Sequence, residues 1–134
     1  GYDLGGQREG DEAIAAGDTL YLTLYWRARE PVSRRYKVFT HLLGETYNAE
    51  SGGFVWGQQD NEPVNGARPT STWRSSELIE DVYALRVDPK APAGSYRIEI
   101  GMYDPATLAR LAVLDSTGQT AADHVVLTSI QVTD

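Results

Sequence analysis

The chain has no cysteine among its 134 residues. Disulfide bonds, thiolate nucleophiles and zinc sites with cysteine ligands are therefore excluded. Histidine is nearly as scarce: His41 and His124 are the two in the sequence, and neither belongs to an HExxH or HxH pattern. A zinc site would have to recruit carboxylates from distant segments, so the sequence predicts no zinc.

Positive charge and long hydrophobic runs are also in short supply. Lys and Arg number 12 against 19 Asp and Glu, which gives a formal net charge of −7. The densest basic segment, Arg34–Lys37, is short, whereas a surface that binds phosphates needs clustered positive charge. We therefore expect no nucleic-acid partner and no binding to anionic lipid. No apolar run is long enough for a transmembrane helix, so no direct membrane insertion is expected of this segment.

Recognisable catalytic signatures are missing. There is no GxSxG nucleophile elbow, and no glycine-rich loop follows a predicted strand and opens a helix. Acidic residues do cluster, but on a surface this acidic carboxylates also lie together by chance, so the clusters do not indicate a glycosidase site. Asp60 and Glu62 are calcium candidates because they supply oxygen ligands, although they lack the spacing of a dedicated calcium loop. We expect no enzymatic activity from this segment and no cofactor, with calcium as the one ion to test.

What the sequence does contain is apolar–polar alternation with a period of two, which is typical of half-buried β-strands. The pattern is clearest at Asp18–Ala28, where leucines and Trp26 share one face. Seven residues on such apolar faces are predicted to be buried: Leu22, Leu24, Trp26, Val38, Ile98, Ile100 and Val132. The predicted strands are Asp18–Ala28, Arg35–Leu43, Phe54–Asp60, Leu78–Val87, Ser95–Tyr103 and Asp123–Val132.

Turn-forming residues separate these strands and leave little room for helix. Glu9–Ala16 has the composition of a helical turn or two. Asp104–Leu111 opens with a helix-capping Asp and a Pro, but it lies between two strands, so we expect a hairpin with at most one helical turn. We predict one all-β domain over residues 1–134, a two-sheet antiparallel β-sandwich of about seven to nine strands, immunoglobulin-like or jelly-roll-like. Because the sequence opens at Gly1 without an initiator Met, we interpret it as a domain of a longer protein.

A series of short sequence motifs, in order along nearly the whole chain, carries a resemblance to one family. They are Gly1–Leu4, Gly17–Leu20, Leu24–Ala28, Tyr36–Phe39, His41–Leu43, Gln59–Asp60, Pro63, Gly66, Pro69–Thr70, Trp73, Ala93–Tyr96, Gly101–Asp104 and Arg110–Leu111. Together they resemble the C-terminal extracytoplasmic β-sandwich domain of multipass bacterial glycosyltransferase-like membrane proteins, which are related to protein mannosyltransferases. The sequence departs from that pattern at Leu108–Ala109, where the family has a hairpin turn containing glycine.

The resemblance implies a function outside the membrane. It implies a non-catalytic accessory domain, extracytoplasmic and tethered through its parent protein, that assists recognition of a glycan or of an envelope protein. The glycosyltransferase chemistry of such proteins belongs to their membrane part. Two alternatives remain open: a structural spacer or protein-interaction domain with no small ligand, and, ranked last, an independent hydrolase.

Aromatic residues are the strongest pointers to a binding site. Trp56 and Trp73 fall in Gly44–Glu77, a long segment whose one strand-like stretch is Phe54–Asp60, and we expect it to be ordered over one sheet face. Sugars bind where aromatic faces lie beside amides and carboxylates. Phe39 and His41 lie on the second face of their strand, and Tyr25 lies on the second face of another strand. The predicted ligand site is Tyr25, His41, Trp56, Asp60 and Trp73. The alternative is that these aromatic rings simply pack beneath the long loop.

Overall fold

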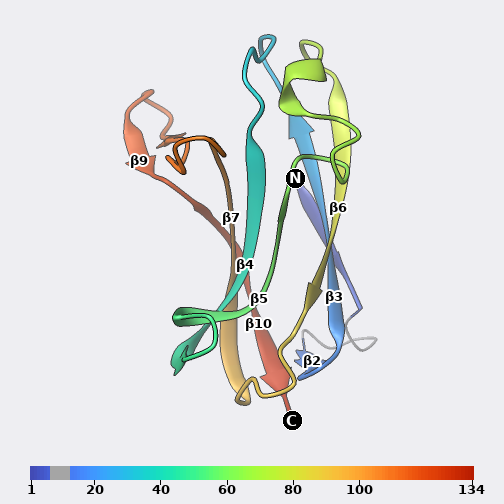
Figure 1. Cartoon of the computed structure of the whole chain (residues 1–134), viewed down its shortest axis with the longest axis vertical. Coiled ribbons are helices and arrows are strands. Elements are labelled where there is room, and N and C mark those ends of the chain that lie inside the picture. The colour runs from blue at the N-terminus through green and yellow to red at the C-terminus, as the bar shows by residue number, and fades with distance from the viewer. Residues whose placement is uncertain (7–12) are drawn as a thin grey trace.

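The computed structural model describes residues 1–6 and 13–134 and is all-β, as the sequence predicts. Among these residues there is no α-helix, and one 3-10 turn, η1, spans Thr70–Thr72. No helix in the described part of the chain is long and apolar enough to cross a membrane. Figure 1 shows an elongated molecule in which the strands run mostly along its long axis.

Ten strands are described, one more than the upper end of the predicted number. They are β1 (Tyr2–Gly5), β2 (Ala13–Ala15), β3 (Thr19–Arg27), β4 (Lys37–Asn48), β5 (Gly53–Asn61), β6 (Leu78–Arg86), β7 (Gly94–Tyr103), β8 (Val113–Leu114), β9 (Thr120–Ala122) and β10 (Val125–Thr133). All six predicted strands are present, and β4 continues five residues beyond the predicted Leu43. The additional strands β1, β2, β8 and β9 are all short, with four residues or fewer.

The strands form three sheets. One has three strands in the order β1-β3-β6, the second is a curled sheet in the order β2-β10-β7-β4-β5, and β8 and β9 form a separate hairpin. Every pairing is antiparallel except that of β2 with β10. Figure 1 shows the β8–β9 hairpin at one end of the molecule and the tip of the β4–β5 hairpin projecting near the other.

The two segments with local helix signals do not form α-helix where they are described. Glu9–Ala16 lies partly outside the described residues, and its last part belongs to strand β2. Asp104–Leu111 is the predicted hairpin connection, closed by a bridge between Tyr103 and Arg110. Leu108 takes a φ of 63°, a left-handed conformation that costs an L-residue energy and ends any helical turn.

The main core lies between the two larger sheets and draws side chains from both. It joins Leu20, Leu22 and Leu24 of β3 to Val38 and Leu42 of β4, among others. Six of the seven residues predicted to be buried are buried. Trp26 is the exception: it is half-buried, because one flank of its ring borders hollows between the sheets.

A second, smaller core cluster holds the connection between β5 and β6. Trp73, Ile79 and Ala28 form this cluster, and Trp26 packs against both clusters. The predicted strand within Gly44–Glu77 is confirmed as β5. The segment is thus a long β-hairpin followed by a connection whose Trp73 points into the protein.

Candidate functional site

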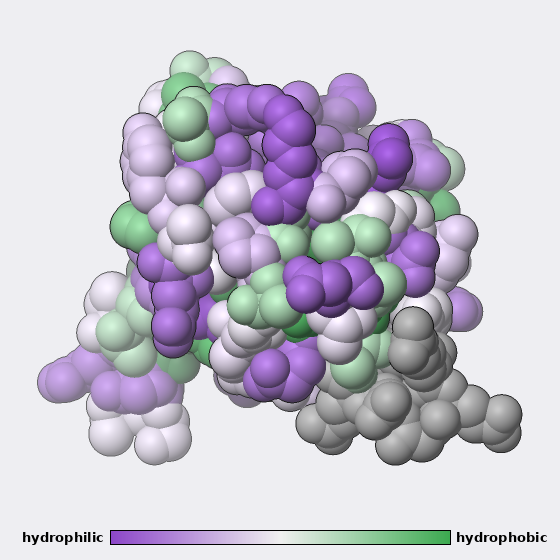
Figure 2. Space-filling model, turned by 90° about the horizontal axis from the view of Figure 1, so that it is seen from below, coloured by the Kyte–Doolittle hydropathy of each residue, from purple (hydrophilic) through white to green (hydrophobic). Residues whose placement is uncertain are grey.

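A broad hollow lies between the β4–β5 hairpin and the connection from β6 to β7. Its volume is about 530 Å³ and it opens to solvent. Figure 2 views the molecule from the end that carries both segments, where hydrophilic residues interleave with a smaller central group of hydrophobic ones. The lining residues are Asn48, Glu50, Ser51, Val55, Trp56, Gly57, Gln58, Arg86, Asp88, Pro89 and Lys90.

Close approach of two backbones forms the base of this hollow. A Cβ at Gly57 would lie 2.9 Å from the carbonyl oxygen of Arg86, so only glycine lets β5 come this near to β6. Next to it, the backbone N–H of Asp88 donates to the carbonyl of Trp56 at 2.8 Å. The β4–β5 pairing changes register between Leu42 and Leu43. The hollow lies between the hairpin beyond this point and the turn that follows β6.

Trp56 is a packing residue that also borders the hollow. It is 8% exposed, and its indole N–H donates to the carbonyl of Thr46 at 3.0 Å. Gly44 makes room for this ring and for Tyr96, because a Cβ there would lie 3.1 Å and 2.6 Å from them. Trp56 therefore contributes part of the wall but offers no open ring face on which a sugar could stack.

The hydrogen-bonding capacity of the hollow comes from its two rims. Lys90 on the β6–β7 connection and Glu50 on the hairpin form an exposed ion pair of 3.3 Å across it. The carboxylate of Asp88 accepts the N–H of Lys90 and fixes this turn. The neighbouring Gln58 and Arg86 are exposed. Donors and acceptors thus face the same open space, an arrangement that suits a ligand rich in hydroxyl groups.

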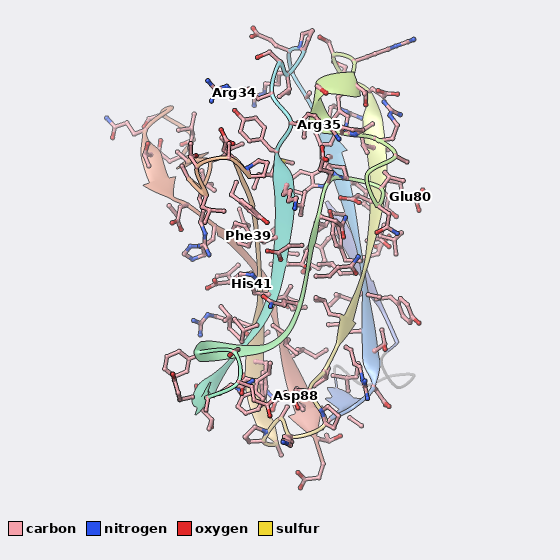
Figure 3. The ribbon with its side chains drawn as sticks, in the orientation of Figure 1. Arg34, Arg35, Phe39, His41, Glu80 and Asp88 are labelled. Carbon is pink, nitrogen blue, oxygen red and sulfur yellow. The ribbon has the colours of Figure 1, made fainter. Side chains whose placement is uncertain are left out.

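His41 and Asp60, two of the predicted site residues, lie together elsewhere, on the outer face of the five-stranded sheet. His41 Nε2 is 3.6 Å from Asp60 Oδ1. Figure 3 shows Phe39 and His41 on the side of β4 that faces away from β3 and β6, and Asp88 near the far end of the molecule. Phe39 is 1% exposed and lies 5.1 Å from the His41 ring. The guanidinium of Arg110 lies 4.2 Å from the centre of the Phe39 ring, so this ring offers no stacking face either.

Both histidines belong to a single row of ionisable groups across this face, which sequence reasoning did not find. His41 pairs across strands with Glu99, and His124 Nε2 lies 3.6 Å from Glu99 Oε1. The other nitrogen of His124 is 2.9 Å from Asp123, and this contact lowers the pKa of the Asp123 carboxyl. The register of β4 against β7 creates the row, and the sequence gives no direct signal of that register. Within residues 1–6 and 13–134, no group of three or more such side chains is placed to hold a metal ion.

The remaining candidates occupy three further places. Tyr25 lies on the three-stranded sheet, where its hydroxyl donates to Asp3 at 2.8 Å and this carboxylate raises the Tyr25 pKa. Trp73 is 6% exposed and lies 6.4 Å from Trp26, with its N–H donated to the carbonyl of Arg68. Glu62, the second calcium candidate, accepts two hydrogen bonds of 2.7 Å from Arg35.

The structure does not bring the five predicted ligand-site residues together in one place. Trp56 and Trp73 belong to different core clusters, and only His41 and Asp60 are in contact with one another. The two indole rings are buried, and each N–H finds a backbone carbonyl within the fold as its acceptor. This is the packing alternative that the sequence left open. Of the five predicted residues, Trp56 alone lines the broad hollow.

Comparison with known proteins adds no family assignment. No protein-family model matches the chain, and no curated protein matches it.

Proposed function

We propose that the chain is a non-catalytic recognition domain that binds a neutral glycan in the hollow between the β4–β5 hairpin and the β6–β7 connection. The observation that carries this proposal is the lining of that hollow, where Gln58, Lys90 and Glu50 place amide, cationic and anionic groups around one open space. A net charge of −7 favours a neutral polar ligand over an anion.

The setting of the domain is part of the same proposal. We infer an immunoglobulin-like or jelly-roll-like β-sandwich, held outside the cytoplasm by a bacterial glycosyltransferase-like membrane protein. The core shared by the two larger sheets supports the sandwich interpretation. The sequence motifs from Gly1–Leu4 to Arg110–Leu111, which resemble that family, support this setting outside the cytoplasm.

A glycan array followed by calorimetric titration of the retained sugars tests this function. Gln58→Ala and Lys90→Ala should each weaken binding about 2- to 10-fold, the effect of one lost hydrogen bond. Gln131→Ala, an exposed glutamine on β10 outside the hollow, is the matched control and should bind as the parent chain does. Equal loss in the control and in Gln58→Ala would place any binding elsewhere.

The competing function is a structural spacer or protein-interaction domain with no small ligand. The burial of both Trp56 and Trp73 favours it, because sugar-binding domains usually present aromatic faces to their ligands. If no glycan is retained by the chain at millimolar concentrations, the spacer function replaces the glycan proposal.

A further inference from the structure

The two larger sheets are joined along one side and separate along the other. On the joined side, the N–H of Asp88 donates to Trp56 of β5, and the N–H of Ala84 on β6 donates to the side-chain oxygen of Gln59. On the opposite side, β1 is the edge of the three-stranded sheet and lies beside the first part of β10, which β2 leaves uncovered because it pairs only with Gln131–Thr133. No ladder pairing joins β1 to β10. The Tyr2 hydroxyl bridges this gap by donating to the carbonyl of Leu127 at 3.2 Å.

Two hollows lie behind this open side and form one cleft between the sheets. Their volumes are about 200 and 170 Å³, and Trp26, Ile100 and Val125 line both. The first is completed by Gly1, Tyr2, Leu24, Tyr25 and Leu127. The second is completed by Gly101, Met102, Leu111, Ala112 and Val113.

The side chains that line the cleft are mostly apolar, and the hydroxyl groups of Tyr2 and Tyr25 donate to Leu127 and Asp3. None of its lining residues has a side chain that is charged at neutral pH. Trp26 directs its N–H away from the hollows, to the Asp81 carboxylate at 3.1 Å, so the indole presents carbon atoms there. A charged ligand group would lose its hydration there and find no side chain of opposite charge, so the cleft favours an uncharged occupant.

We propose that this cleft is a binding site for an uncharged hydrocarbon group, either a benzene-sized ring or a short alkyl chain. Its size supports this class of ligand, because an apolar cavity of about 150 Å³ takes up benzene or xenon and excludes water. The site is separate from the broad hollow, since the two share no lining residue.

An added peptide strand is a poorer fit to the same cleft. A strand needs about 4.7–4.9 Å of clear spacing on each side along the hydrogen-bonding direction. The Tyr2–Leu127 hydrogen bond closes the gap between the edges of β1 and β10 at the position such a strand would occupy. The occupant is therefore a small group that enters beside this bridge.

The single methionine of the chain provides a direct reporter of occupancy. Met102 lines the second hollow and is the one Met in the sequence, so a chain labelled with [13C-methyl]methionine gives one methyl resonance. Titration with butylbenzene up to its solubility limit should shift this resonance saturably. Val125→Asp, which places a carboxylate at the wall shared by both hollows, should weaken binding at least about tenfold.

Val126→Asp is the matched control, because it introduces the same charge one residue further along β10 and outside the lining of either hollow. It should bind butylbenzene as the parent chain does. The two positions are comparable because Val125 and Val126 have similar exposure, at 38% and 48%. Leu111→Asp repeats the test from another segment should Val125→Asp fail to fold.

Three results would overturn the proposal. They are a methyl shift that stays linear to the solubility limit, equal loss of binding in the Val125 and Val126 variants, and a resonance that responds only to phosphatidylcholine vesicles. The last result would make the cleft a membrane-contact surface instead of a site for a dissolved ligand.

Discussion

The indole N–H of Trp26 on β3 donates a hydrogen bond of 3.1 Å to the carboxylate of Asp81, a fully buried residue of the neighbouring strand β6. The second oxygen of the same carboxylate accepts the backbone N–H of Val64 at 2.7 Å. One buried acid therefore holds a half-buried tryptophan and the connection from β5 to β6 in place.

Replacing this acid should destabilise the domain. Asp81→Ala leaves the Trp26 and Val64 N–H groups without their acceptor, and each such donor costs about 1–3 kcal/mol when buried. We expect the free energy of unfolding, measured by urea denaturation, to fall by about 2–5 kcal/mol. Asp81→Asn keeps one acceptor oxygen, so its free energy of unfolding should fall by less than that of Asp81→Ala. A loss below about 1 kcal/mol for Asp81→Ala would contradict this role.

Trp73 is expected to matter for stability instead of for ligand contact. Because its ring is buried against Trp26, Trp73→Ala should cost about 3–5 kcal/mol as a large-to-small change in a core cluster. Thermal unfolding followed by circular dichroism measures the effect. A fully stable variant that had lost a bound glycan would instead restore Trp73 as a sugar platform.

Gly101 should tolerate no side chain. A Cβ at this position would lie 2.3 Å from Cζ of Phe39, so Gly101→Ala must displace a buried ring. Overpacking of this kind costs about 1–3 kcal/mol. Gly53→Ala is the control, because a Cβ there meets nothing within 4 Å, and its unfolding curve should match that of the parent chain within about 0.5 kcal/mol.

Leu108→Gly should stabilise the domain. Leu108 has a φ of 63° and is 72% exposed, so glycine relieves left-handed strain at little loss of packing. We expect a gain of about 0.5–1 kcal/mol in the free energy of unfolding. Leu114→Gly, at an exposed strand position without positive φ, should destabilise instead. Equal effects of the two substitutions would show that the turn is unstrained.

The ion pair of Glu77 should make part of the stability acid-sensitive. The Arg68 guanidinium at 2.6 Å, and then the N–H of Arg74, hold the pKa of the Glu77 carboxyl below its usual 4.5. A lowered pKa means that this stabilisation is complete above the usual value and is lost as pH falls through the lowered one. The difference in melting temperature between the parent chain and Glu77→Gln should therefore be constant above about pH 6 and shrink by about pH 3. A constant difference down to pH 3 would contradict the pairing.

The six longer strands were predictable because each has a local signal, which the four short strands β1, β2, β8 and β9 lack. Alternation with a period of two marks β3 and β6 directly, and the buried faces follow from it. The extension of β4 has no such signal, since Glu45, Thr46 and Tyr47 are all exposed. Pairing with β5 and the hydrogen bond from the Asn48 side chain to Val55 stabilise that end, and both depend on the partner strand.

The site was less predictable because it depends on contacts between distant segments. The sequence shows that Trp56 and Trp73 sit among turn residues, but it does not show that both rings turn inward. The row from Asp60 to His124 likewise exists because β5, β4 and β7 are neighbours in one register. Trp56, which the sequence suggested as a ligand residue, lines the broad hollow, whereas the opposite wall at Asp88 and Lys90 has the sequence of an ordinary turn.

The parallel pairing of β2 with β10 sets Ile14 against Val132, so the five-stranded sheet joins residues from opposite ends of the described chain. A contact of such long sequence separation must close a large loop before it contributes stability, which slows folding. During synthesis, Ile14 emerges long before its partner. We therefore expect the native fold to form only after translation has passed Val132, and until then the apolar faces of β3 and β4 are exposed to chaperones or to aggregation.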